Sequence, residues 1–178
     1  AASDVYKRQS EYSLLDGACR IKKIVKKVKE LGQTAIAVTD HGVMYGAVDF
    51  YREALAAGIK PIIGCEVYVA PRTRFDKEAK LDSRPFHLIL LCKNNKGYQN
   101  LIKLVSLSYT EGFYSKPRVD LEILEKYSDG LICLSGCIAG EIAKKLINRE
   151  YESAKKAALN YERIYGKGNY YLEVQNHG

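Results

Sequence analysis

Two stretches of the chain decide the fold: Ala35-Ile36-Ala37-Val38-Thr39-Asp40-His41-Gly42, and Pro61-Ile62-Ile63-Gly64-Cys65-Glu66-Val67-Tyr68-Val69. Each contains a short apolar run rich in β-branched residues, which is typical of a strand. A helix is predicted between them over about residues 44–57, closed by Gly58, because glycine suits a left-handed cap. A strand, a helix and a second strand in this order favour an α/β architecture with a largely parallel sheet or barrel.

The same alternation continues along the rest of the chain. Further strands are predicted at residues 86–91, 131–134 and 170–175. Helices are predicted at residues 21–29, 95–109, 120–127, 139–148 and 151–165. The polar stretch 71–85 is predicted to be an exposed loop or hairpin. No internal repeat and no convincing domain boundary are visible in the sequence.

The bulk properties fit one globular domain. The chain has 178 residues, of which 47% are hydrophobic and 28% charged, and this is enough for a core. No apolar run reaches the roughly eighteen residues of a membrane helix, so neither a membrane span nor a membrane partner is predicted. The five cysteines lack CxxC spacing, which argues against a disulfide framework or zinc finger and favours a reducing cytoplasm.

The charge balance permits a polyanionic partner. A net charge of +7 and a pI near 9.1 allow contact with nucleic acid. The lysines gather on the predicted helix 21–29, whose apolar residues recur at i, i+3, i+4 and i+7. We favour a solvated face of an amphipathic helix over a phosphate-binding surface as the interpretation of these lysines.

The first nine residues differ from the rest of the chain. Residues 1–9 have neither a starting methionine nor a clear hydrophobic period. We predict that they are a non-native scar of cloning or assembly and set them aside from the fold. Residues 10–178 are then the domain.

Asp40, His41 and Glu66 are candidates for chemistry. An acidic residue beside an imidazole, just after a strand, lies where parallel α/β folds place functional groups. The alternative, equally weighted, is that Asp40 caps the next helix and His41 is an exposed loop residue. Glu66 lies inside an apolar strand, where a buried carboxylate needs a partner or a metal. We favour the buried interpretation of Glu66 over an outward-facing edge position.

His87, Cys137 and Asp16 have ordinary explanations when taken singly. His87 opens a strand and could be a satisfied core histidine, Cys137 could be a small buried hydrophobe, and Asp16 could cap a helix. Taken together, the candidates follow successive strands and are the ligand types of a divalent transition-metal site: Asp16, Asp40, His41, Glu66, His87 and Cys137. Zinc, manganese and iron all suit this mixed set, and such clusters hydrolyse phosphoesters.

Other catalytic signatures do not occur in the sequence. It has no GxxxxGK[ST], GxGxxG, GxSxG or HExxH, and no carboxylate triplet like that of a polymerase palm. No other catalytic residue is assigned, and nothing in the chain predicts nucleotide addition.

The chain resembles a known family along most of its length. The stretches that carry the resemblance are Ser10–Gly17, Thr39–Gly42, Ala57–Val69, His87–Asn94, Gly97–Leu101, Leu134–Ile142 and Leu172–Gly178. From residue 10 onward they resemble the polymerase-and-histidinol-phosphatase (PHP) domain family, in the form that opens bacterial polymerase III alpha subunits. The resemblance implies a distorted seven-stranded (β/α) barrel, incomplete in this chain, with the six ligands named above. His177 falls in a family-like ending and is not counted as a ligand.

Two departures from the family concern its ligands. The family's first strand ends in a His-x-His pair, where this chain has Lys7 and Gln9. The family's later Asp-x-His pair is expected beyond Gly178. About four of nine expected ligands are therefore missing, and the resemblance implies an incomplete cluster and little activity for this chain alone.

The resemblance also implies a function for the parent protein. Such a parent is a DNA-directed DNA polymerase (a nucleotidyltransferase) in replication, and it works with DNA and other holoenzyme subunits. Its PHP domain acts either as a metal-dependent 3′→5′ exonuclease or as a structural platform that docks a proofreading subunit. The alternative is a free-standing PHP phosphoesterase acting on a small phosphate ester.

Overall fold

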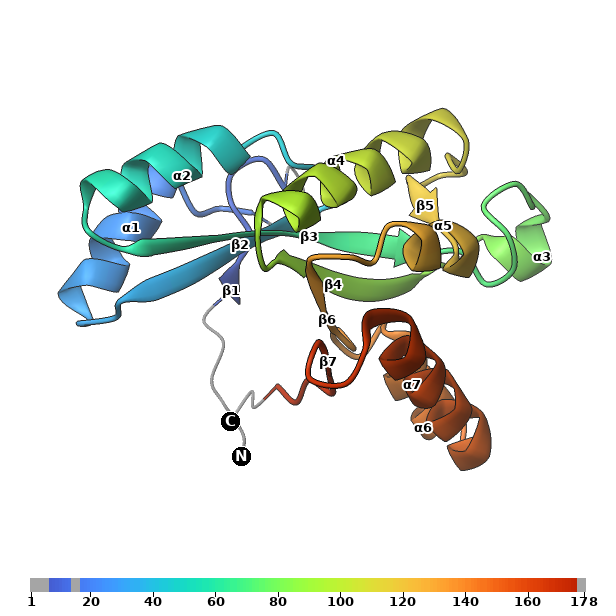
Figure 1. Ribbon diagram of the computed structural model, residues 1–178. Helices are drawn as coiled ribbons and strands as arrows, with labels where there is room; N and C mark the ends of the chain where they lie inside the picture. The colour runs from blue at the N-terminus through green and yellow to red at the C-terminus, as the bar shows by residue number, and fades with distance from the viewer. Residues whose placement is uncertain (1–6, 14–16, 176–178) are drawn as a thin grey trace.

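The computed structural model describes residues 7–13 and 17–175, and in this part of the chain a mixed sheet is covered by helices (Figure 1). The strands are β1 (Lys7–Arg8), β2 (Ala35–His41), β3 (Lys60–Val69), β4 (Phe86–Cys92), β5 (Arg118–Val119), β6 (Leu131–Leu134) and β7 (Tyr170–Tyr171). The helices are α1 (Ile21–Glu30), α2 (Ala47–Ala56), α3 (Ala79–Asp82), α4 (Asn95–Thr110), α5 (Leu121–Lys126), α6 (Glu141–Ile147) and α7 (Tyr151–Tyr165). The predicted alternation of strands and helices is confirmed.

The strand order is β1-β2-β3-β4-β6-β7, with β5 paired to the end of β3. β1, β2 and β3 are parallel, and so are β6 and β7, but β4 is antiparallel to both of its neighbours. The prediction of a largely parallel sheet was therefore wrong for β4. The reason is the connection: a parallel return needs a crossover, usually a helix along the sheet, whereas segment 70–85 stays beyond the end of β3 with the short α3 (Figure 1).

The sheet curls into a distorted barrel. Its two edge strands, β1 and β7, approach each other, and an ion pair of 3.0 Å joins Lys7 Nζ of β1 to Glu173 Oε1 just after β7. The predicted barrel is confirmed. Lys7 and Arg8 belong to the segment that we set aside, yet they pair with Ala37 and Val38 of β2. That residues 1–9 are non-native stays a prediction.

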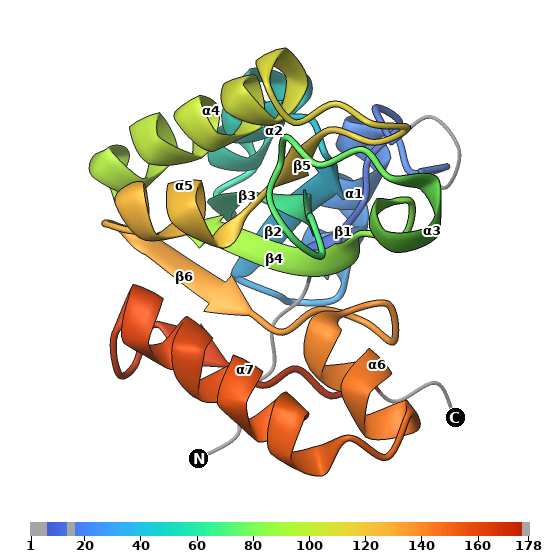
Figure 2. The same ribbon diagram turned by 90° about the vertical axis from the view of Figure 1, so that its right-hand side faces the viewer.

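Helices α1, α2, α4, α5 and α7 pack on one face of the sheet, which is the outer face once the sheet curls. In the view of Figure 2, α1, α2, α4 and α5 lie above the curled sheet, while α6 and α7 lie below it and contact β4, β6 and β7. The main core joins strands to α4, α5 and α7 through fully buried side chains, including Leu90, Leu101, Leu104 and Leu124. A second cluster packs α1 and α2 against β2.

The lysine-rich helix α1 is amphipathic, as predicted. Ile21, Ile24, Val25 and Val28 are buried in the second cluster, whereas its lysines are exposed. Some of these lysines lie within ion-pair distance of Glu30 or Glu53. Among the described residues, no helix is both long enough and apolar enough to cross a bilayer.

The segment 71–85 was predicted to be an exposed loop, and this was wrong in part. It contains α3, and two of its charged side chains are buried, Arg74 and Asp82. Arg74 Nη1 lies 3.0 Å from an Asp120 carboxylate oxygen, and Asp82 Oδ2 lies 2.6 Å from Arg72 Nη2. The two buried charges are therefore paired, Asp82 with Arg72 of the same stretch and Arg74 with Asp120 outside it, which removes most of the penalty for burying them.

Arg118 ties this segment to the rest of the fold. Its side chain is fully buried and donates to the backbone carbonyls of Gly112, Asp82, Arg74 and Asp76 at 2.8–3.3 Å. Burial lowers the pKa of this guanidinium. A single side chain therefore holds two segments that the sequence separates by about thirty residues (Asp82 and Gly112).

Core packing predicts the cost of truncating β4. Leu90→Ala removes a fully buried side chain and should lower the free energy of unfolding by about 2–5 kcal/mol, because a cavity remains. Leu55→Ala, at a position 52% exposed on α2, is the matched control and should change it by less than about 0.5 kcal/mol. Urea denaturation followed by circular dichroism measures both. Equal midpoints for the two variants would contradict the assignment of this core.

Candidate metal centre

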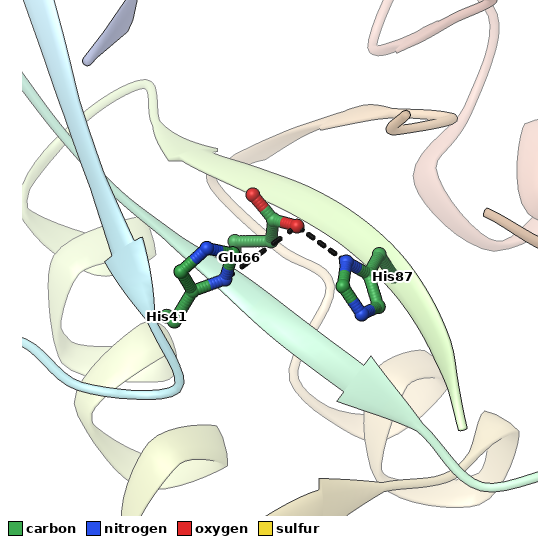
Figure 3. Close-up of side chains that lie close together, drawn as sticks. All are labelled: His41, Glu66 and His87. Atoms are coloured by element: carbon green, nitrogen blue, oxygen red, sulfur yellow. Dashed lines mark hydrogen bonds and ion pairs between the residues drawn. The ribbon is translucent and has the colours of Figure 1, made fainter. Parts of the chain in front are cut away.

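His41, Glu66 and His87 converge from three neighbouring strands (Figure 3). His41 ends β2 and is the register partner of Glu66 in β3, so both side chains lie on one face of the sheet. His87 lies at the start of β4, and the antiparallel direction of β4 brings that start to the end of β3. One ligand atom from each residue lies within 4.8 Å of the other two.

The Glu66 carboxylate lies between the two imidazoles. Its Oε1 is 2.6 Å from His87 Nδ1 and 3.6 Å from His41 Nδ1. The Glu66 side chain is 5% exposed, which confirms the prediction that it is buried. Burial raises the pKa of Glu66, but the hydrogen bond from His87 and the charge of His41 outweigh it, so that the net pKa is lowered.

Cys137 lies beside His87. Its Sγ is 3.7 Å from His87 Nδ1, and its loop is bound to β4 through the hydrogen bond from His87 N to the carbonyl of Ala139. The contact with Cys137, followed by the hydrogen bond to Glu66, raises the pKa of His87 to about 9. The same contact with His87 lowers the pKa of Cys137, and this favours the thiolate that binds metals.

Tyr68 was missed by the sequence analysis. Its ring stacks on His41 at 6.2 Å between centroids and meets the edge of His87 at 5.1 Å. Tyr68 lies two residues after Glu66, so strand alternation places both on one face. That spacing was the available signal, and it marks Tyr68 as the residue that orients both imidazoles.

Asp40 is not brought into this group. It precedes His41 in the same strand, so its side chain points to the opposite face. Its carboxylate is 2% exposed and accepts hydrogen bonds from Ser10 N at 2.6 Å, Ser10 Oγ at 2.7 Å and Ser13 Oγ at 2.8 Å. Asp40 therefore fastens residues 10–13 to the end of β2.

Three further positions concern the predicted cluster. Asp16 and His177 lie outside the described residues, so the assignment of Asp16 as a ligand stays a prediction. Gln9, at one of the places where the family has histidine, donates from Nε2 to Glu66 Oε2 at 3.1 Å.

The donor set at this site fits a divalent transition metal. Two imidazole nitrogens and one carboxylate are the protein ligands of many catalytic zinc sites, and a neighbouring thiol is compatible with zinc or iron. The burial of Glu66 supports the same conclusion, because the protein keeps a carboxylate in its interior between two basic groups.

The chain belongs to the PHP domain family, whose sequence profile matches residues 6–177. It is similar over 95% of its length to the DNA polymerase III alpha subunits of Borreliella burgdorferi, at 51% identity, and of Treponema pallidum, at 50% identity. The chain spans 14–15% of the length of these relatives.

A solved structure is similar in fold. It is that of an amidohydrolase from Chromobacterium violaceum with bound sulfate and no metal. The match covers 98% of this chain and 87% of the amidohydrolase chain, with a TM-score of 0.51 and 13% sequence identity. The likeness supports the barrel described above.

Metal affinity should depend on pH through His87. Metal binding needs a neutral imidazole, and the pKa of His87 is about 9 in the metal-free protein, so a bound metal must displace its proton. Affinity for Zn²⁺ should rise up to about tenfold per pH unit between pH 7 and 9 and then level off. Calorimetry in two buffers of different ionisation enthalpy measures the released proton.

The same proton has an opposite effect on the metal-free fold. Because the folded pKa of His87 is raised above its usual 6.5 to about 9, this group stabilises the protein fully below pH 6.5 and loses that effect as pH rises through about 9. His87→Gln should remove the effect on stability and lower by about one the number of protons released when the metal binds. Zinc affinity that is constant between pH 7 and 9 would contradict this account.

Asp40 and Glu66 should respond differently to loss of charge. Asp40→Asn should destabilise the fold by about 1–3 kcal/mol, because three buried donors lose their carboxylate, and should leave metal content unchanged. Glu66→Gln should lower metal content. Elemental analysis after dialysis, combined with urea denaturation, separates the two effects. Loss of metal in Asp40→Asn at full stability would make Asp40 a ligand.

Proposed function

We propose that this chain is part of a bacterial DNA polymerase III alpha subunit and that its PHP domain holds divalent metal for phosphoester hydrolysis. The identity of about half of all residues with alpha subunits, over 95% of the chain, supports the first part. The convergence of His41, Glu66 and His87 carries the second part.

The residues divide into metal holders and positioning groups. His41, Glu66 and His87 would hold the metal, with Cys137 and Asp16 as further ligands. Zinc, manganese and iron all suit this set. A bound metal supplies a Lewis acid and a water of lowered pKa. Tyr68 keeps the two imidazoles in place, and Asp40 fixes Ser10 and Ser13, which precede Asp16 in the sequence.

A 3′→5′ exonuclease is the hydrolase function that best suits a polymerase subunit. Its partners would be DNA and the other subunits of the holoenzyme, and its location the cytoplasm. The polymerase chemistry would belong to parts of the relatives that this chain does not match. We expect this chain alone to be inactive as a polymerase and nearly inactive as an exonuclease, because it has Lys7 and Gln9 where the family has histidines.

A structural platform that docks a proofreading subunit is the second candidate. One observation favours it: protein donors already satisfy Glu66, since His87 and Gln9 each bind one of its carboxylate oxygens. A site satisfied in this way needs no metal for stability. The free-standing phosphoesterase is not favoured, because the relatives above are alpha subunits.

Melting curves distinguish the hydrolase from the platform. We expect Zn²⁺ or Mn²⁺ to raise the melting temperature, because a ligand that binds only the folded state stabilises it by about 2.7 kcal/mol at a hundredfold excess over Kd. The double variant Lys7→His/Gln9→His should bind more metal and show a larger shift, and extension to the next Asp-x-His should add to it.

The control variants isolate the site. Glu66→Gln should abolish the shift, while Glu152→Gln, exposed on α7, should leave it intact. If neither the chain nor the histidine variant gains stability or retains metal by elemental analysis, the hydrolase proposal is wrong and the platform is left.

A further inference from the structure

One lysine, Lys116, is not a candidate metal ligand but lies beside Tyr68 at the edge of the metal centre. Lys116 Nζ is 5.3 Å from the centroid of the Tyr68 ring, and that ring contacts both His41 and His87. Lys116 is exposed, and it forms no ion pair with the carboxylates of the described residues. Its charge is therefore available to an anion at the edge of the site.

The segment that carries Lys116 is held firmly against the site. Tyr114 N donates to the carbonyl of Lys116 at 3.0 Å, across a turn in which Ser115 has a left-handed φ of 59°. Pro117 packs directly on Gly42, where an added Cβ would lie 2.9 Å from the proline ring. Arg118, which follows Pro117, is fully buried and donates to the carbonyls of Gly112, Asp82, Arg74 and Asp76, which anchors the end of this segment.

Lys144 of α6 is a contrasting lysine, which lies next to the start of β4. It donates to the carbonyl of Pro85 at 3.4 Å, and burial lowers its pKa. Lys116 differs because its ammonium is exposed while its backbone is fixed, which is the combination that suits a ligand-positioning group.

We propose that Lys116 is a positioning residue that binds a phosphate of a single-stranded nucleic acid, next to the phosphate that a metal held by His41, Glu66 and His87 would bind. The inference rests on the proposed function and specifies its substrate. Lys116 stands beyond Tyr68 rather than among the metal donors, so it would reach a second phosphate. A small monoester has no second phosphate, whereas a nucleic-acid strand has one beside every scissile bond.

Anisotropy of a fluorescein-labelled oligothymidylate, titrated at several salt concentrations, tests the contact. Lys116→Met should weaken binding about two- to fivefold and reduce the slope of log K against log salt by about 0.7, the value for one phosphate contact on a single strand. Lys116→Arg should restore both. Lys103→Met, which removes an exposed lysine of α4, is the control for net charge.

The titrations are run with Mn²⁺ and with chelator, so that the metal-site proposal and the Lys116 proposal are tested independently. The lysine contact is a charge effect, and its slope change should persist in chelator. Glu66→Gln should remove only the part of the binding that needs Mn²⁺. If Mn²⁺ has no effect on binding, the metal proposal fails, while the slope in chelator still decides on Lys116. If Lys116→Met matches Lys103→Met in slope, or lowers only the melting temperature, Lys116 is structural and the inference is overturned.

Discussion

A buried carboxylate in the middle of β3 constrains everything around it. Glu66 lies in a strand that contributes to the core, and a charge there is tolerated because imidazoles from β2 and β4 face one carboxylate oxygen and the Gln9 amide donates to the other. Both imidazole contacts require a particular register: parallel with β2, so that His41 lies opposite Glu66, and antiparallel with β4, so that His87 comes within 2.6 Å. A slip of one residue in either pairing would turn the imidazole to the opposite face.

The sequence predicts the elements of this fold well, because helices and strands follow local periodicity. Strand direction does not follow from local pattern. The segment 70–85 is long enough for a crossover, and only tertiary contacts show that Arg74, Asp82 and Arg118 keep it beyond the end of β3. Buried ion pairs between distant residues look like solvated charges until the partners are known.

The sequence predicted which residue types form the candidate site, but it predicted less well which particular residues belong to it. His41, Glu66 and His87 follow from residue type and strand position. Asp40 has the right chemistry beside them, but strand alternation directs it to Ser10 and Ser13. Tyr68 had only its two-residue spacing from Glu66 as a signal, and Lys116 had none, because an aromatic residue in a strand and a lysine in a turn are common. Their roles depend on contacts across the fold.

The Arg118 anchor has a consequence for how this protein can vary. Surface segments rich in polar residues ordinarily accept inserted residues, because little of their backbone is bound. Here the backbone carbonyls of Arg74, Asp76, Asp82 and Gly112 all converge on one guanidinium. Three of these carbonyls, those of Arg74, Asp76 and Asp82, belong to the segment 71–85, so the number of residues between them is constrained and the segment behaves as a spacer of set length. Insertions between them should be as damaging as insertions within a strand, although the composition of the segment gives no warning of it.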